Sequence, residues 1–204
     1  MKLYDTAVAP NPRRVRWVMA EKAITDIDVV RLNMGEGQHK TEALLSQTEG
    51  FVGLPILEMD DGTTLTESLA ICRYLESRYP EPNLFGTTPE ETAVIEMWTR
   101  RMELLVATPL MIGVRHLSPI LAGLEQQDAV VGGHNRDQGL KTLALLDHHL
   151  KGRDWIAGDR LTIADIVAFS GLDFTRLIRL DLPAELTEVA RWADAMRARP
   201  AAQA

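Results

Sequence analysis

Glu67 and Ser68 are the residues of this sequence best suited by type and position to hold a charged ligand. They come where a turn runs into an apolar helical stripe, so they should open a helix. The first N–H groups of a helix lack intrahelical partners and lie at the positive end of its dipole, which favours a bound anion. The Ser68 hydroxyl can donate to that anion, and Glu67 can hold an ammonium group. The alternative is a pair that only caps the helix and lies in water.

A second helix start is expected at Asn11-Pro12, an N-cap residue followed by proline at the first helical position. Three arginines follow, Arg13, Arg14 and Arg16. They could steer an anionic ligand, although a solvated helix face is the more frequent explanation for such a cluster.

Cys72 is the only cysteine, so the chain can form neither an internal disulfide nor a thiolate metal cluster. Its place on an apolar stripe with Leu69 and Leu75 predicts a buried, inert thiol. His148 and His149 are adjacent, point to different helix faces and have no companion at metal-ligand spacing. We therefore expect no metal, and any thiol chemistry should come from a ligand.

Composition excludes several classes of function. A net charge of -7 over 204 residues would repel a phosphate backbone, so we expect no nucleic-acid partner. No stretch approaches the ~20 apolar residues that span a bilayer, and the first residues lack the apolar core of a signal peptide. Together with the single cysteine, this predicts a cytoplasmic protein that does not bind membranes.

The first part of the chain has the pattern of an α/β domain. Short strands are expected at residues 2–5, 27–30, 53–59 and 64–65. The tight turn at 60–62 makes the last two strands antiparallel. Helices are expected after Asn11 and from Glu67 to Tyr79, with an irregular helical stretch near residues 40–45. The resulting order, β-α-β and then β-β-α, is typical of a thioredoxin-like domain over residues 1–80, with a linker at 81–88.

Residues 89–204 show no convincing strand and predict an all-α helical bundle. The apolar stripes are Val94, Met97, Trp98, Leu105; then Leu140, Leu143, Ala144, Leu150; then Ile163, Ile166, Val167, Ser170, Phe174. Thr162 and Asp165 have the spacing of a capping box, flanked by Leu161 and Ile166 at the positions of a hydrophobic staple. Asp165 is therefore assigned to folding and not to a functional site.

This two-part layout resembles that of cytosolic glutathione transferases, and short strings in the family's order carry the resemblance along nearly the whole chain. They are APNPRRV (9–15), GQHK (37–40), GLP (53–55), LTES (65–68) with Ile71, WIAG (155–158) and TIAD (162–165). The string EMWTRR (96–101) and the following His116 are most similar to the fungal glutathione transferase 2 type and its bacterial relatives.

The resemblance implies a binding site for glutathione. Leu54-Pro55 is similar to the family's cis-proline element, whose preceding residue pairs with the ligand's peptide backbone; without the resemblance, a trans bond would be favoured. Glu67 and Ser68 would hold the γ-glutamyl end. His39 and Lys40 would meet the glycine carboxylate, the alternative for this pair being a solvated loop.

Catalysis in this family is ionisation of the bound thiol. The serine or cysteine that often assists falls on Ala9, which has no side-chain donor. The N-terminus of the first helix and Asn11 are then the nearest stabilisers, with a pure N-cap as the alternative for Asn11; Tyr4 and Thr6 rank lower. His116, followed by Ser118, resembles the fungal pair that holds a water, although a lone histidine near a helix end is more often structural.

The function implied is a glutathione transferase that joins the glutathione thiolate to small, mostly apolar electrophiles in detoxification. Glutathione would be the co-substrate, and the helical domain would complete the electrophile pocket. A homodimer is expected, with Met97, Arg100 and Arg101 near the partner subunit. Alternatives are a non-catalytic binding or assembly module of the same fold, or a glutathione-dependent peroxidase, dehalogenase or isomerase.

Overall fold

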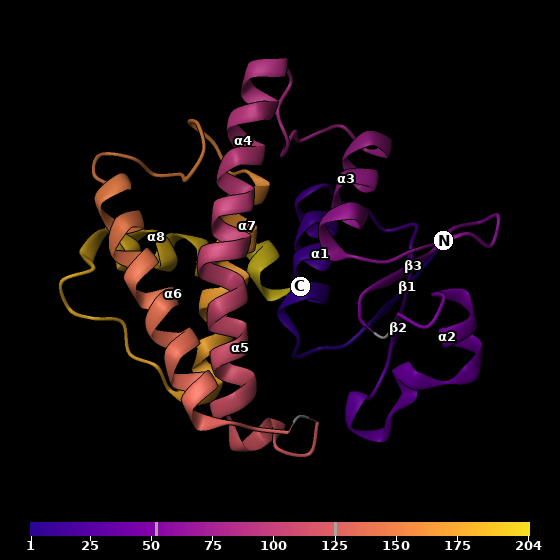
Figure 1. The fold of residues 1–204 in the computed structure, drawn as a ribbon. Coiled ribbons are helices and arrows are strands. Elements are labelled where there is room, and N and C mark those ends of the chain that lie inside the picture. The colour runs from indigo at the N-terminus through magenta and orange to yellow at the C-terminus, as the bar shows by residue number, and fades with distance from the viewer. Residues whose placement is uncertain (52, 125) are drawn as a thin grey trace. The chain divides into compact units, whose positions relative to one another are not determined.

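A computed structural model describes residues 1–51, 53–124 and 126–204. The chain divides into two compact units, Met1–Pro82 with Ala204, and Asn83–Gln203 (Figure 1). The first contains the sheet and the second is helical wherever it has regular structure.

Unit 1 is built on a four-stranded sheet of order β2-β1-β3-β4. The strands are β1 (Lys2–Asp5), β2 (Asp28–Arg31), β3 (Ile56–Glu58) and β4 (Thr64–Leu65). β1 and β2 run parallel, while β3 is antiparallel to both β1 and β4. The predicted β-α-β and β-β-α order is therefore confirmed. β3 is shorter than predicted because Pro55, which has no N–H to donate to a ladder, precedes it directly.

The helices of unit 1 are α1 (Pro10–Glu21), α2 (Glu42–Gln47) and α3 (Ser68–Arg78), with short 3₁₀ turns at Met34–Glu36 and Gln38–Lys40. α1 and α3 pack together beside the sheet, with α2 on its other side (Figure 1). α1 begins earlier than predicted: Ala9 is its N-cap and Pro10 its first residue, so the assignment of Asn11 as N-cap was wrong.

Two of the three α1 arginines are buried, which contradicts the solvated helix face favoured by the sequence. Arg16 forms an ion pair with the fully buried Asp5 and donates to the carbonyl oxygens of Thr6 and Ala7, at 3.1 and 3.3 Å. It thereby braces the loop between β1 and α1. Burial lowers the pKa of Arg16, while the charge of Asp5 opposes that shift.

Unit 2 is a bundle around a buried central helix. Its helices are α4 (Pro89–Met102), α5 (Thr108–Leu117), α6 (Ala129–His149), α7 (Ile163–Phe174) and α8 (Thr187–Arg197), with a π-helical segment at Glu103–Ala107 and short 3₁₀ turns at Pro119–Leu121, Thr175–Ile178 and Pro200–Gln203. α7 is buried on nearly every side and packs against α4, α5 and the π segment. α5 packs along α6, where Gly139 leaves room for Leu110.

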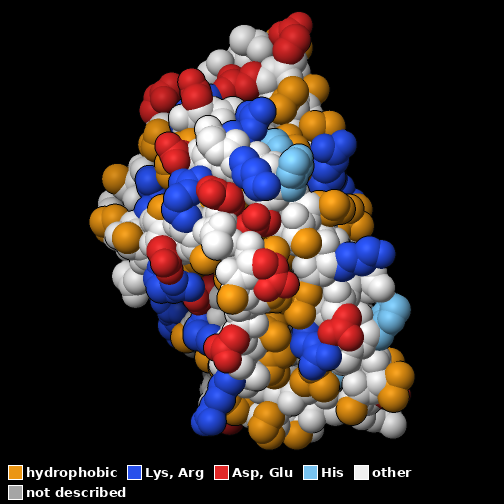
Figure 2. Space-filling model, turned by 90° about the vertical axis from the view of Figure 1, so that its left-hand side faces the viewer, with side chains coloured by type: hydrophobic (Ala, Val, Ile, Leu, Met, Phe, Trp, Pro, Cys, Tyr) orange, Lys and Arg blue, Asp and Glu red, His pale blue; other side chains and the backbone are white. Residues whose placement is uncertain are grey.

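The apolar stripe predicted on α4 is on the wrong face. The core side of α4 is formed by Ile95, Thr99 and Met102. Val94 and Met97 from the predicted stripe are instead 45% and 41% exposed. α4 is apolar on two faces, so periodicity alone could not decide which one enters the core. Other apolar side chains of the chain are exposed as well. On the face of the molecule that Figure 2 shows, apolar side chains lie among acidic and basic ones.

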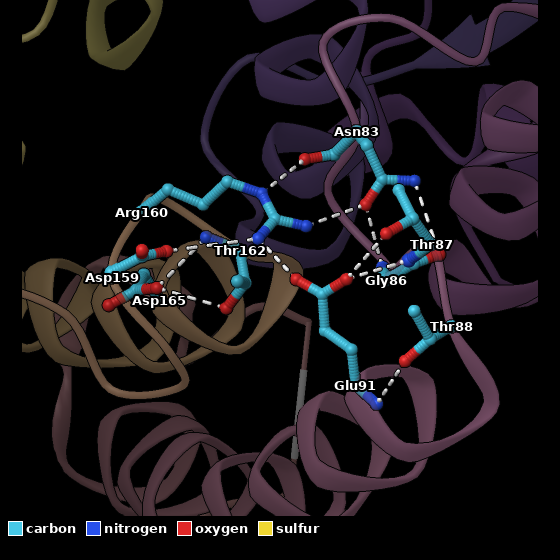
Figure 3. Close-up of polar contacts among 9 residues, drawn as sticks. All are labelled: Asn83, Gly86, Thr87, Thr88, Glu91, Asp159, Arg160, Thr162 and Asp165. Atoms are coloured by element: carbon cyan, nitrogen blue, oxygen red, sulfur yellow. Dashed lines mark hydrogen bonds and ion pairs between the residues drawn. The ribbon is translucent and has the colours of Figure 1, made fainter.

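The predicted capping box at the start of α7 is confirmed. The Thr162 N–H and hydroxyl both donate to the Asp165 carboxylate, at 3.0 and 3.1 Å. Beside it, Arg160 forms an ion pair with Glu91 of α4 and donates to the Asn83 side chain at 2.9 Å (Figure 3). These contacts tie the segment before α4 to the bundle, and the arginine holds the pKa of Glu91 down to about 2.

Candidate functional site at one end of the sheet

The start of α1 has a restricted set of hydrogen-bond donors. Pro10 and Pro12 have no N–H, and the Arg13 N–H is 3.4 Å from the Ala9 carbonyl oxygen. Asn11 is therefore the residue of this first turn whose backbone N–H can meet a ligand. Its side chain is not a helix cap, and its Oδ1 is buried without a hydrogen-bond partner. Buried polar atoms without a partner are rare in folded proteins, and a bound ligand is one group that could pair with this one.

The Leu54-Pro55 peptide bond is cis, as the resemblance implied. The Leu54 side chain is buried in a small cluster with Leu44 of α2 and Ile56 of β3. Its backbone groups, by contrast, have no hydrogen-bond partner within the described part of the chain. An anchored side chain with unpaired backbone groups can hold the backbone of a bound peptide in the manner of an added strand.

Glu67 and Ser68 open α3, as predicted, and they differ in exposure: Glu67 lies in water, as the capping alternative expects, whereas Ser68 is buried. Glu67 is the exposed N-cap of α3, makes no side-chain capping bond and has the left-handed φ of +64°. Such a backbone costs a non-glycine residue about 1–3 kcal/mol and is enriched at functional sites. Ser68 is only 5% exposed, and its Oγ accepts a hydrogen bond from the Arg14 Nη1 at 3.2 Å.

His39 and Lys40 lie on the 3₁₀ turn after β2, and they differ in exposure. Lys40 is exposed, whereas His39 is 6% exposed and its Nδ1 is buried without a partner. The solvated-loop alternative was therefore wrong for His39. Burial, and then the charge of Lys40, lower the pKa of His39, so that it is neutral near pH 7. His39 can thus offer a hydrogen bond and Lys40 a positive charge.

The sheet topology brings these segments to one end of the sheet. β1 and β2 are parallel and end together, with Asp5 paired to Arg31. β3 runs the opposite way and begins at Ile56, opposite Tyr4 near the end of β1. β4 is antiparallel to β3 and therefore ends where β3 begins. The start of α1, the 3₁₀ turn after β2, the cis-proline before β3 and the start of α3 all leave the sheet from this end, and together we call them the sheet-end site.

Of the two lower-ranked donors of the same region, Tyr4 is engaged elsewhere. The Tyr4 hydroxyl donates to Glu58 at 2.7 Å, and this hydrogen bond raises the pKa of Tyr4. Thr6 is buried, with its carbonyl oxygen held by Arg16. Cys72 is fully buried, and burial raises its pKa to about 12, which fits the inert thiol expected from the sequence.

His116 lies in unit 2, near the end of α5, and its Nδ1 accepts a hydrogen bond from the Asp128 N–H at 3.0 Å. This bond assigns the proton of the neutral ring to Nε2, so Nδ1, the basic nitrogen, is already engaged. Ser118 is buried and donates to the Leu177 carbonyl oxygen at 3.2 Å. In the described residues no hydrogen bond joins His116 to Ser118. The Nδ1 of His116 thus has a structural contact, while its Nε2–H has no hydrogen-bond partner in the described residues.

No group of three or more His, Cys, Asp or Glu side chains that could hold a metal is found in residues 1–51, 53–124 and 126–204. Across the same ranges, no helix is long and apolar enough to cross a bilayer.

Comparison with known proteins decides the family. Residues 3–83 match the model of the glutathione S-transferase N-terminal domain, and residues 110–200 match that of the C-terminal domain. The chain belongs to the glutathione S-transferase family. It is 34% identical to glutathione S-transferase 2 of Saccharomyces cerevisiae over 98% of this chain and 87% of that protein. The resemblance inferred from short strings is thereby confirmed.

Solved structures of the glutathione S-transferase family have the same fold. The crystal structure of Gtt2 from Saccharomyces cerevisiae aligns with a TM-score of 0.90 at 34% identity, covering 100% of this chain and 99% of that one. A glutathione S-transferase domain-containing protein of Marinobacter aquaeolei aligns equally well, with a TM-score of 0.90, 34% identity, and coverage of 99% and 100%.

Sequence reasoning missed Arg14 and Arg16 as parts of this region. The available signal was their position: both lie among Val15, Trp17 and Val18, which are all fully buried on α1. An arginine between such neighbours must find a buried partner.

Proposed function

We propose that this chain binds glutathione at the sheet-end site of unit 1 and joins the glutathione thiolate to small, apolar electrophiles. The observation that carries the proposal is the set of unpaired polar groups collected there. Asn11 Oδ1, His39 Nδ1 and the Leu54 backbone groups lack partners in the described structure, and they lie on three segments that leave the same end of the sheet.

Each end of the tripeptide has a matching anchor. Ser68 and the free N–H groups of the first α3 turn suit the γ-glutamyl carboxylate, while the exposed Glu67 suits the ammonium group. The Leu54 backbone suits the central peptide. Lys40 suits the charge of the glycine carboxylate, and neutral His39 supplies a hydrogen bond.

The thiol requires a stabiliser other than Ala9. A free cysteine thiol has a pKa of about 8.5, and lowering it by ~2 units takes ~2.7 kcal/mol in favour of the thiolate. We assign this to Asn11, through its backbone N–H at the positive end of α1 and through its side-chain amide, because hydrogen bonds to charged groups contribute ~1.5–3 kcal/mol each. A water held by His116 is the second proposed contributor.

Calorimetric titration with glutathione tests the binding proposal. Ser68→Ala should weaken binding about tenfold, since it removes one hydrogen bond to a charged group. Ser77→Ala, at the exposed far end of the same helix, is the matched control and should bind like the parent. Equal affinities in the parent and Ser68→Ala would contradict the assignment of the γ-glutamyl end.

Two further substitutions separate the proposed thiolate stabilisers. Asn11→Ala should raise the pKa of the bound thiol by ~1 unit, corresponding to ~1.4 kcal/mol lost. His116→Ala should lower the rate with a small electrophile more than the affinity for glutathione. If neither substitution changes the thiol pKa or the rate, both assignments are wrong. A parent that binds glutathione but is inactive across a panel of electrophiles would instead favour the non-catalytic module.

We also propose that the chain forms a two-fold homodimer through the outer face of α4 and the π segment. Val94, Met97, Leu104 and Leu105 are 45%, 41%, 51% and 52% exposed, and they recur at helical spacing. A self-complementary apolar stripe of this kind suits a closed dimer. Met97→Glu should convert the dimer to a monomer in sedimentation experiments, while Leu145→Glu on α6 should not. A monomeric parent would refute the proposal.

A further inference from the structure

Arg14 is a buried cation that the roles assigned above do not use. Its side chain comes from the first turns of α1 and is 2% exposed. Its Nη1 donates to Ser68 Oγ at 3.2 Å, although the two residues are 54 positions apart in the sequence. A buried guanidinium must be hydrogen-bonded, and the Ser68 hydroxyl is one of the groups that Arg14 contacts.

The bond from Arg14 fixes the direction in which the Ser68 hydroxyl can donate. A serine hydroxyl has one hydrogen and two lone pairs, and here one lone pair accepts from Arg14. The hydroxyl hydrogen must therefore point away from the guanidinium. Ser68 donates to no acceptor in the described parts of the chain, so its hydrogen is available to a ligand.

The same place has the electrostatic character of an anion site. Ser68 is the first residue of α3, where the N–H groups of the opening turn have no intrahelical partner. The positive charge of Arg14 also acts on Cys72, one turn further along α3. It favours the thiolate and so lowers the pKa of Cys72, but burial has the larger effect and the pKa is raised. A carboxylate at the start of α3 would meet the serine hydroxyl, the free N–H groups and a nearby buried positive charge.

We propose that Arg14 is a positioning residue for the ligand's α-carboxylate: it orients the Ser68 hydroxyl toward that carboxylate and supplies a buried positive charge behind it. This inference rests on the proposed binding of glutathione. It implies selectivity for ligands that carry a carboxylate at the γ-glutamyl end. A purely structural arginine would confer no such selectivity.

The test compares two ligands in calorimetric titrations. One is glutathione, and the other is its analogue with 4-aminobutanoate in place of the γ-glutamyl residue, which lacks only the α-carboxylate. Arg14→Met should lower the affinity for glutathione by about tenfold or more and change the affinity for the analogue less than about threefold. Arg14→Lys keeps the charge without the planar fork and should fall between Arg14→Met and the parent. Arg13→Met, a half-buried neighbour on the same helix, should change neither affinity.

A double substitution tests whether Arg14 acts through Ser68. Ser68→Ala should weaken glutathione binding less in the Arg14→Met background than in the parent. Equal losses for glutathione and the analogue would show a merely structural role and overturn the inference, as would an unchanged affinity for glutathione. If Arg14→Met does not fold by circular dichroism, Arg14→Lys provides the same comparison of ligands. A parent that binds neither ligand refutes the proposed function instead.

Discussion

Asp165 offers a stringent test of how unit 2 is held together. Its fully buried carboxylate accepts four hydrogen bonds: from the N–H of Ile156 at 2.9 Å, from the N–H and hydroxyl of Thr162, and from the Trp192 indole at 3.1 Å. Asp165→Ala would leave three buried N–H groups unpaired, each costing about 1–3 kcal/mol. That total is comparable with the whole stability of a typical domain, so Asp165→Ala should not fold.

Asp165→Asn allows the stability to be measured, because its amide keeps one acceptor oxygen. It also removes the carboxyl group that titrates. Burial raises the pKa of Asp165 to about 6, above its ordinary value of 3.8. The folded state therefore binds the proton more tightly than the unfolded state. Proton binding to Asp165 therefore stabilises the folded state fully below pH ~4, and this stabilisation is lost as the pH rises through ~6. The whole change in the free energy of unfolding is at most about 3 kcal/mol.

The assay is urea unfolding of the parent and of Asp165→Asn, monitored by circular dichroism at a series of pH values from 4 to 7. The parent should exceed the variant by about 2–4 kcal/mol near pH 4, and this difference should shrink as the pH rises. Asp194→Asn, at an exposed aspartate of α8, is the control and should change stability by less than about 0.5 kcal/mol. A difference that stays constant or grows with pH would refute the reasoning.

Substitutions to and from glycine at three positions test backbone strain and packing. Glu67→Gly should be about 0.5–1 kcal/mol more stable than Glu67→Ala in urea unfolding, because glycine adopts the φ of +64° freely. Both variants should bind glutathione more weakly than the parent. Equal stability of the two variants would show that Glu67 is unstrained. Gly86→Ala should lose more than about 2 kcal/mol of stability, since its φ is +101° and a Cβ would lie 2.6 Å from the Thr92 nitrogen. Gly133→Ala, inside α6 with open space around it, should gain up to about 1 kcal/mol of stability. Similar thermal midpoints for Gly86→Ala and Gly133→Ala would contradict the packing argument.

The sequence correctly predicted those elements whose structure is determined by residues a few positions apart in the chain. The tight turn at 60–62 gave the antiparallel pair β3 and β4, and the Thr162 and Asp165 spacing gave the start of α7. Errors arose where two local interpretations compete. Pro10 and Pro12 both suit the first helical position, and the helix begins at the earlier one.

Features that depend on tertiary packing could not be predicted from the sequence. α4 carries apolar residues on two faces, and packing against α7 buries the one with Ile95 and Met102. The hydrogen bond between Arg14 and Ser68 likewise forms only because α3 packs against α1. The residues proposed for the sheet-end site were identified through the resemblance, while their unpaired atoms became evident only in three dimensions.

The ionisation of bound glutathione tests the central claim most directly. Thiolate absorbance in the ultraviolet is followed against pH with the parent protein in excess over glutathione, and with glutathione alone as reference. The proposed site predicts a bound thiol whose pKa lies ~2 units below that of the free tripeptide. A bound thiol that titrates like free glutathione, or no binding at all, would contradict the proposal that this chain activates glutathione for transfer.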